Sequence, residues 1–194
     1  MPAPTVFNQD VILDEAFRIA RTEGAQRLSA RRIAQNLGCS TQPIYSAFGS
    51  MQKLQDRVLQ KAKSYVVEYL SREQQDEDPF FAMGMQYFRF SREERILFKW
   101  LFLERNMVLP FEKTRKLFAP LVDRIKLDDS VNELTEDQLR RIARDMMIYT
   151  HGLTSFMYDD NRPNAEAYVR EQLMRMGKTV IEWEHGQKNI GNSQ

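Results

Sequence analysis

Two short stretches of helical periodicity, separated by a glycine, lie between Leu28 and Leu54. In the first stretch Ile33 and Leu37 are four residues apart, and Ser29 precedes them at the position of an N-cap. Gly38 follows directly, and a glycine there ends a helix because it adopts the left-handed conformation without steric cost. This pattern predicts a helix-turn-helix.

The second helix of this motif is expected to begin at Ser40, whose hydroxyl can accept a hydrogen bond from the amide of Gln42. Pro43 suits the first turn, because the amide donors of that turn have no helical partner. Ile44 and Phe48 form the inward side. The outward residues near the helix N-terminus are then Thr41, Gln42, Pro43, Tyr45 and Ser46.

Those outward side chains have the chemistry that reads double-stranded DNA. A glutamine amide pairs twice with adenine, and a threonine methyl group or a proline ring packs on the methyl group of thymine. A tyrosine hydroxyl donates to a phosphate, and recognition helices read bases with their N-terminal residues. The alternative is a helix-turn-helix that serves only for packing.

Basic residues are concentrated around the same motif. Between Gly24 and Lys63, seven basic residues stand against the single acid Asp56, an excess of about +6, whereas the whole chain carries +1. A charge run is often only a solvated face, but this one coincides with the predicted reading helix, as binding to a phosphate backbone requires. The predicted DNA-contacting residues are Ser29, Arg31, Arg32, Ser40, Thr41, Gln42, Pro43, Tyr45, Ser46 and Lys53.

The N-terminal part of the chain resembles the DNA-binding domain of the TetR family of bacterial transcriptional regulators. The resemblance implies a dimer in which each protomer places the helix Ser40–Phe48 in a major groove, usually to repress a promoter until a small ligand releases it. Two positions depart from the family pattern: Ala47 replaces a phosphate-contacting residue, and Met51 replaces a common lysine for which Lys53 can substitute. The matching residues are Ala16, Phe17, Ile19, Ala20, Glu23, Gly24, Leu28, Ser29, Ile33, Ala34, Leu37, Gly38, Ser40, Ile44, Tyr45, Phe48, Ser50 and Leu54.

The remaining sequence predicts an all-α fold, because it has helical periodicity and no alternating strand pattern. We expect a DNA-binding domain over residues 1–52 and a helical regulatory domain, for ligand binding and dimerisation, over residues 53–194. The expected elements of the second part are a helix from the Ser50 cap to Tyr69, a joint over Ser71–Asp78, and helices over Phe80–Phe90, Ile96–Asn106 with Ser91 as its cap, Phe111–Arg124 with an interruption at Pro120, Thr135–Tyr158 and Asn164–Glu184.

The last two helices carry regular apolar rows. The family resemblance implies that such helices from two protomers form a four-helix interface, in which the same surface of each protomer meets its copy. Packing within one protomer is the alternative. The predicted interface residues are Leu139, Ala143, Met146, Thr150, Leu153, Val169, Leu173, Met176 and Val180.

Methionine and aromatic residues accumulate in the second part, where eight of the ten methionines follow residue 80. Flexible thioethers and large rings can line a pocket for a small apolar or amphipathic molecule, although a filled core fits the same pattern. For His151 the alternative is a buried histidine whose ring nitrogens have hydrogen-bond partners within the protein. Gly152 suggests the close approach of a helix or a ligand. The candidate pocket residues are Phe81, Met85, Phe88, Trp100, Phe102, Met107, Phe118, Met146, Tyr149 and His151.

Other classes of protein receive little support. Cys39 is the only cysteine, and His151 and His185 are far apart, so we predict no metal site, no cofactor and no enzyme activity. The start of the sequence lacks a signal-peptide pattern and no stretch suits a membrane helix, so a cytoplasmic location is expected. A regulator of the same fold that takes no small molecule, and either responds to a protein partner or binds DNA constitutively, is the alternative function.

Overall fold

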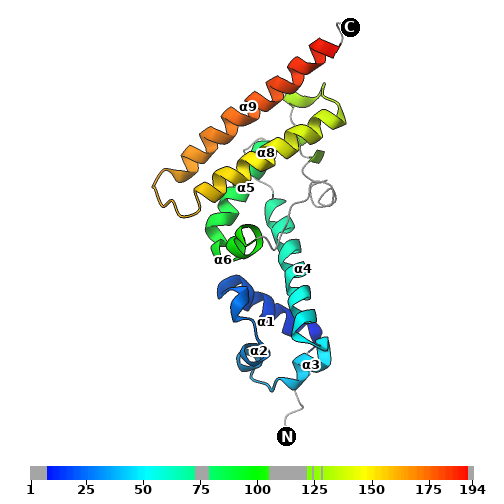
Figure 1. The fold of residues 1–194 in the computed structure, drawn as a ribbon, viewed down its shortest axis with the longest axis vertical. Helices are drawn as coiled ribbons and strands as arrows, with labels where there is room; N and C mark the ends of the chain where they lie inside the picture. Colours follow the sequence, from blue (N-terminus) through cyan, green and yellow to red (C-terminus); the bar gives the residue numbers. More distant parts are fainter. Residues whose placement is uncertain (1–7, 73–78, 105–121, 124, 128, 192–194) are drawn as a thin grey trace. The chain divides into compact units, whose positions relative to one another are not determined.

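The computed structural model describes residues 8–72, 79–104, 122–123, 125–127 and 129–191. Within these ranges every regular element is helical, which confirms the predicted all-α class (Figure 1). Element η2 is a π-helical turn. The elements are α1 Gln9–Thr22, η1 Ala25–Arg27, α2 Ala30–Leu37, α3 Gln42–Phe48, α4 Met51–Leu70, α5 Pro79–Glu93, α6 Arg95–Phe98, η2 Lys99–Leu103, η3 Asp129–Val131, α8 Glu136–Phe156 and α9 Ala165–Gly191.

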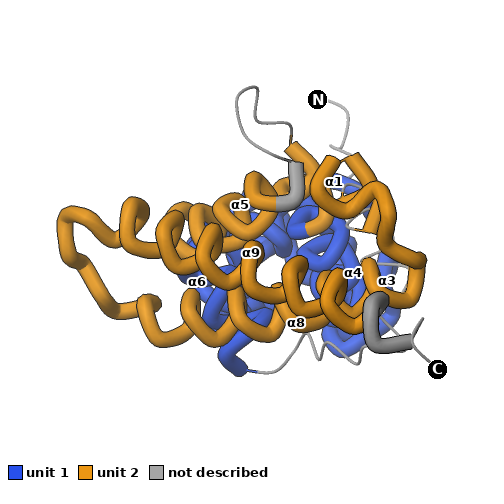
Figure 2. Tube along the Cα trace, turned by 90° about the horizontal axis from the view of Figure 1, so that it is seen from above, with its two compact units in different colours: residues 1–66, 94–107 blue, residues 67–93, 108–194 orange. Residues whose placement is uncertain are grey.

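The chain forms two compact units (Figure 2). Unit 1 contains residues 1–66 and 94–107, and unit 2 contains residues 67–93 and 108–194. The chain therefore leaves unit 1 inside α4 and returns to it between α5 and α6. A domain boundary after residue 52 would instead fall at the start of α4, whose residues up to Val66 belong to unit 1.

Four local signals in the sequence have the predicted effect on helix ends. The Ser29 and Ser50 hydroxyls each accept a hydrogen bond of 3.2 Å from the amide three residues later, and so cap α2 and α4. Gly38 ends α2 in the left-handed conformation, with φ of 67°. Thr135 and Gln138 form the capping box that begins α8.

Helix α3 begins two residues later than expected. Thr41, and not Ser40, occupies the N-cap position, and its side chain caps no amide. Thr41 already has the right-handed helical conformation, with φ of −75° and ψ of −14°. The expected hydrogen bond from Gln42 to Ser40 is therefore wrong, and Pro43 lies within the first turn as predicted.

Ser91 does not cap a new helix. It is fully buried within α5, which continues to Glu93, and its hydroxyl donates to the carbonyl of Phe88 at 2.6 Å. The next helix, α6, spans only Arg95–Phe98 before the π turn of η2. Burial explains the difference, because a hydroxyl in an apolar core bonds to its own helix rather than to a distant cap.

The other expected elements differ less or lie outside the described residues. Helix α9 continues to Gly191, beyond the expected end at Glu184. The expected helix Phe111–Arg124 and most of the joint Ser71–Asp78 fall outside the described ranges. No helix in the described part of the chain is both long and apolar enough to cross a membrane.

Unit 1 contains a buried ion pair between distant segments. Glu94, whose residue surface is only 8% exposed, accepts two hydrogen bonds from the guanidinium of Arg21 on α1, one of them 2.7 Å long from Nε. The Tyr65 hydroxyl of α4 donates to the same carboxylate at 2.7 Å. One carboxylate thus joins α1 and α4 to the start of α6.

Unit 2 is built on α5, α8 and α9, which pack against one another around an apolar core. Arg92 on α5 closes the C-terminal end of α8: its Nη2 atom donates to the carbonyls of Met157 at 2.9 Å and Asp160 at 2.6 Å. The same guanidinium lies over the ring of Phe88, 5.0 Å from its centre. Carbonyls at a helix end lack helical partners, so one side chain satisfies the turn between α8 and α9.

Candidate nucleic-acid interface and regulatory core

Helices α2 and α3 are held on α1 by their apolar sides. Ile33 and Ala34 of α2 and Ile44 and Phe48 of α3 are buried, as their spacing predicts. With those sides fixed in the core, the opposite side of each helix faces solvent. The helix-turn-helix thus presents a defined outer surface.

The structure exposes the predicted reading residues together at the start of α3. Ser40, Thr41, Gln42 and Ser46 are exposed, and Pro43 is half-buried. Tyr45 keeps 47% of its surface although it is a large ring. Thr41, Gln42 and Tyr45 are thus exposed together at the N-terminal end of α3. This is the end with which recognition helices contact bases in the major groove of DNA.

Gln9 positions the other end of α3. Its Nε2 atom donates to the carbonyl of Ala47 at 2.6 Å and so ties the start of α1 to the last turn of α3. The two residues are 38 positions apart, so no local signal in the sequence could reveal this contact. Ala47 thus contributes to positioning through its backbone.

Two exposed basic residues flank the reading helix. Arg31 extends from the first turn of α2 into solvent. The Lys53 ammonium lies over the turn between α3 and α4, 3.8 Å from the point where a side chain on Gly49 would begin. Lysine and arginine in such places contact the phosphate backbone, which fixes the register of a reading helix on DNA.

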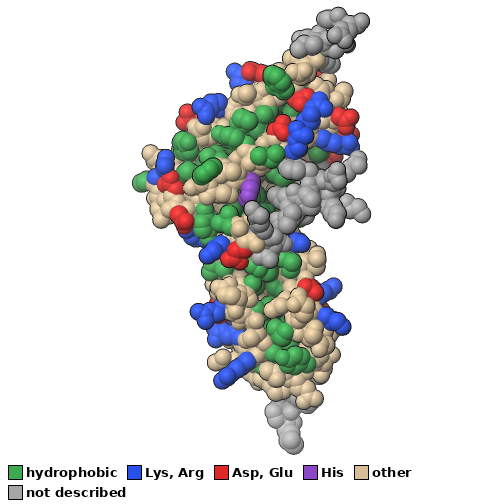
Figure 3. All heavy atoms as spheres, in the orientation of Figure 1, with side chains coloured by type: hydrophobic (Ala, Val, Ile, Leu, Met, Phe, Trp, Pro, Cys, Tyr) green, Lys and Arg blue, Asp and Glu red, His purple; other side chains and the backbone are tan. Residues whose placement is uncertain are grey.

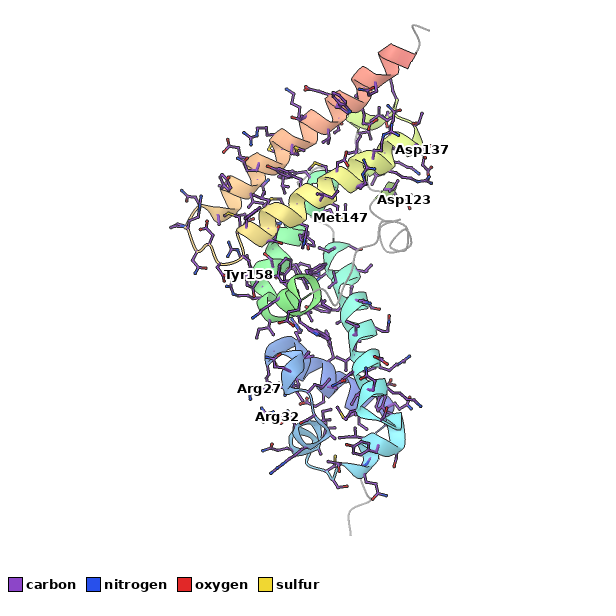
Figure 4. All side chains as sticks on the ribbon, viewed as in Figure 1. Arg27, Arg32, Asp123, Asp137, Met147 and Tyr158 are labelled. Atoms are coloured by element: carbon purple, nitrogen blue, oxygen red, sulfur yellow. The ribbon has the colours of Figure 1, made fainter. Side chains whose placement is uncertain are left out.

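Part of the predicted positive charge is neutralised. Arg32 donates to Glu23 at 2.9 Å, and Lys61 contacts Asp14 at 2.5 Å. Because both acids lie outside the segment counted in the sequence, the excess of about +6 falls to about +4. Lys and Arg side chains still project from the margins of unit 1 in Figure 3, and Figure 4 labels Arg27 and Arg32 beside α2.

Polar contacts also join α2 to α1. Glu15 accepts from Asn36 of α2 at 2.6 Å and from Arg18 at 2.8 Å. The Arg18 hydrogen bond, supported by Asn36, lowers the pKa of Glu15 below its ordinary value. This anchor therefore persists at neutral pH and weakens only as the pH falls through the lowered pKa of Glu15.

The candidate pocket residues do not all lie in one place. Met85, Phe88 and Met146 are buried in the core of unit 2, and Phe81 and Tyr149 pack against it. His151 is half-buried on α8 and makes a hydrogen bond with Tyr87. The structure assigns Trp100 and Phe102 to unit 1, while Met107 and Phe118 fall outside the described residues.

The predicted interface residues face inward. The structure buries Leu139, Met146, Thr150, Val169, Leu173 and Val180 within one protomer, and Ala143, Leu153 and Met176 pack against the same core. Their rows join α8 to α9, and little of their surface is left for a second copy. The exposed apolar residues of these helices are Ile148, Phe156, Tyr168, Met174 and Trp183.

Solved structures with the same arrangement of helices identify the fold of the chain. A TetR variant from Acinetobacter baumannii AYE, solved in complex with minocycline, matches over 92% of this chain and 98% of its own, with a TM-score of 0.60 and 12% identity. A tetR-family transcriptional regulator from Streptomyces coelicolor matches over 96% of this chain and 87% of its own, with a TM-score of 0.63 and 16% identity. The chain has the TetR fold. No family model and no curated protein sequence matches it.

The two units differ in the side chains that they present. Across the described part of unit 1, the exposed polar and basic residues of the helix-turn-helix form one surface. In unit 2, aliphatic side chains form most of the buried core around α5, α8 and α9, together with Met85, Phe88, Met146 and Met157. Within the described ranges no three histidine, cysteine or acidic side chains are grouped as metal ligands.

Proposed function

We propose that this protein is a transcriptional repressor that binds a palindromic DNA operator as a homodimer and releases it when a small, largely apolar molecule binds to unit 2. The exposed start of α3 carries this proposal. Gln42, Thr41 and Tyr45 combine base-reading and phosphate-binding groups on one rigid helix. Arg31 and Lys53 add charges that pair with phosphates.

The outer side of α8 supports the homodimer. Ile148 and Phe156 are 55% and 90% exposed, and Gly152 lies between them at a spacing of four residues from each. A side chain placed on Gly152 would meet no atom of the described residues outside its own stretch of α8, so this glycine leaves room for the close approach of another molecule. A second copy fits, because a two-fold axis lets the same apolar row meet itself.

Release by a ligand follows from the spacing of two reading helices. In a dimer the two copies of α3 must lie about 34 Å apart to enter successive major grooves. A ligand lowers the affinity for DNA if it binds more tightly to a dimer in which the two copies of α3 have another spacing. The loss of DNA affinity is limited by the difference between the ligand's affinities for the two dimer arrangements. Helix α4 is the proposed lever, because the chain passes from unit 1 into unit 2 within it.

Selection of binding sites from random duplex DNA with the purified protein tests the proposal. An enriched palindrome is the expected result, since a symmetric dimer reads two inverted half-sites. Transcription from a promoter that carries this palindrome should fall when the protein is added. Failure to enrich any sequence at low salt, with protein freed of bound small molecules by refolding, would contradict the proposal.

Replacing Gln42 by alanine should relax selectivity at one base pair of each half-site. The loss of a bidentate contact is expected to cost about 1–3 kcal/mol of discrimination there, while affinity for random DNA stays nearly constant. Competition binding against operators with each base pair substituted in turn measures this effect. Lys53→Ala should instead weaken specific and random DNA alike, because it removes a phosphate contact.

Gln60→Ala provides the matched control, because Gln60 is an exposed glutamine on α4. It should leave both affinity and selectivity unchanged. Equal losses on operator and random DNA for Gln42→Ala would show that Gln42 does not read a base.

A further inference from the structure

Two buried hydroxyl groups on α8 have no hydrogen-bond partner among the residues that the structure describes. They belong to Thr154, whose residue surface is fully buried, and to its neighbour Ser155. Hydroxyls within helices usually bond to a carbonyl three or four residues earlier, as Thr22, Ser91 and Thr179 do here at 2.6–2.9 Å. The hydroxyls of Thr154 and Ser155 do not follow this rule. An unpaired buried polar group destabilises a folded protein and calls for a reason.

Thr154 and Ser155 lie one turn after a polar pair. His151 precedes them by three and four residues, so each of the two side chains is a neighbour of His151 on the helix surface. The Nδ1 atom of His151 is 2.9 Å from the Tyr87 hydroxyl on α5. The unpartnered hydroxyls therefore adjoin an existing polar contact between α5 and α8.

The order of contacts places Thr154 between these two helices. Gly84 of α5 approaches Thr150, Tyr87 bonds to His151, and Arg92 bonds to Met157. Thr154 lies between the last two contacts along α8 and shares a face with Thr150, four residues earlier. Met147, labelled in Figure 4, lies on α8 before this stretch, and Tyr158, also labelled, lies two residues after the end of the helix.

We propose that Tyr87, His151, Thr154 and Ser155 form the polar end of the effector site, and that they bind an uncharged hydroxyl or carbonyl group of an otherwise apolar molecule. The inference rests on the proposed function and deepens it, because it names the chemical class of the effector. The ligand oxygen supplies the missing hydrogen bonds of Thr154 and Ser155.

The charges around this cluster favour a neutral ligand. Burial raises the pKa of Tyr87 and lowers that of His151, so both side chains are uncharged at neutral pH. The basic residues that follow Tyr87 on α5 are engaged with other groups: Arg89 binds Glu166 at 2.7 Å, and Arg92 binds the carbonyls at the end of α8. A buried ligand charge would find no counter-charge among these groups, and burial of an unpaired ion is unfavourable.

The same helices supply apolar surroundings. Met85 and Phe88 on α5, Met146 on α8 and Met157 at the C-cap of α8 belong to the core of unit 2. Methionine side chains adapt their shape at low cost, so they can move to admit a rigid hydrocarbon body. The expected effector is thus a hydrocarbon skeleton with one or two neutral oxygen atoms.

Matched probes test this class directly on the full chain. Naphthalene, 2-naphthol and 2-naphthoate share one skeleton and differ in having no oxygen, a neutral hydroxyl or a carboxylate. Isothermal titration should show that 2-naphthol binds about five- to tenfold more tightly than naphthalene, the gain from one added hydrogen bond. It should bind more tightly than 2-naphthoate as well.

Thr154→Val should remove this preference, because valine has the shape of threonine without the hydroxyl. Affinity for 2-naphthol should fall to that for naphthalene, while the melting temperature of the ligand-free variant should rise because an unpaired polar group is lost. Ser155→Ala should reduce the preference in the same direction. Thr179→Val is the control, since the Thr179 hydroxyl already bonds to the Arg175 carbonyl at 2.9 Å and the residue is exposed on α9.

Three outcomes would overturn the inference: equal affinity of the wild-type protein for 2-naphthol and naphthalene, tightest binding of 2-naphthoate, or no binding of any probe. An unchanged preference in both Thr154→Val and Ser155→Ala would overturn it too. Operator binding, measured separately on the same proteins, distinguishes failure of the effector site from failure of the proposed function. If the protein binds its operator but binds 2-naphthol and naphthalene equally, only the proposed effector class is refuted. If it prefers 2-naphthol but binds no operator, only the proposed function as a DNA-binding regulator is refuted.

Discussion

Replacement of both Ile148 and Phe156 by aspartate is expected to yield a monomer and to reduce operator affinity on the order of 100-fold or more, because charges are costly in an apolar interface. In a two-fold symmetric dimer each substitution occurs twice, so four carboxylates would meet across one contact. The half-sites would then be bound independently, and the gain in affinity from linking them would be lost. Sedimentation at micromolar concentration and fluorescence anisotropy with the selected operator measure the two effects.

Trp183→Asp is the matched control for this experiment. Trp183 is also an exposed apolar residue, 67% accessible, but it lies on α9 and outside the proposed contact of Ile148 and Phe156 on α8. It should leave the dimer and operator binding intact. A dimer that survives the double substitution at Ile148 and Phe156 would show that another surface joins the protomers.

Glu94→Ala is expected to destabilise unit 1 by about 1.5–3 kcal/mol, the range for hydrogen bonds to a charged group. The substitution removes the partner of Arg21 and of the Tyr65 hydroxyl at once. Part of the loss is offset because the Arg21 side chain is 40% exposed and regains water. Tyr65→Phe should cost less, about 0.5–1.5 kcal/mol, since it removes one hydrogen bond.

Fluorescence can follow unit 1 alone. The two tryptophans of the chain lie in different units, Trp100 in unit 1 and Trp183 in unit 2. In a Trp183→Phe background, urea unfolding monitored by Trp100 therefore reports the stability of unit 1. Glu104→Ala, which changes an exposed glutamate of unit 1, is the control and should unfold like its parent. A Glu94→Ala protein as stable as this control would show that the buried carboxylate contributes nothing.

The helix-turn-helix could be predicted well because its signals are local. The Ser29 cap and the Gly38 stop act within a few residues of themselves, and both are confirmed. The N-cap of α3 was misassigned by one residue because Ser40 and Thr41 both suit an N-cap, and only the backbone conformation of Thr41 decides between them. Local chemistry thus located the motif but not its edge.

Contacts between distant residues could not be predicted. Arg21 and Glu94 are 73 positions apart, and nothing near Glu94 marks it as buried. Ser91 and the acids after it have the composition of a helix start, yet burial within α5 gives Ser91 another partner. A capping pattern in sequence therefore says little where the surrounding residues form a core.

The regulatory helices show another limit of periodicity. An apolar row on α8 indicates that one side is buried, but it does not say whether α9 of the same chain or a second protomer covers it. Leu139 and Leu173 face the protomer core, whereas Ile148 and Phe156, which are not among the predicted interface residues, remain exposed. Thr154 was likewise not predicted, because an unpartnered hydroxyl is a property of the packed structure.

The single guanidinium that closes α8 also limits how the protein can be engineered. Surface turns between helices ordinarily accept inserted tags or new chain termini. The turn after α8 is different, because Arg92 holds the carbonyls of Met157, Tyr158 and Asp160 at one spacing. An affinity tag or a circular permutation site placed there would separate acceptors that share one donor group, so fusion partners belong at the ends of the chain.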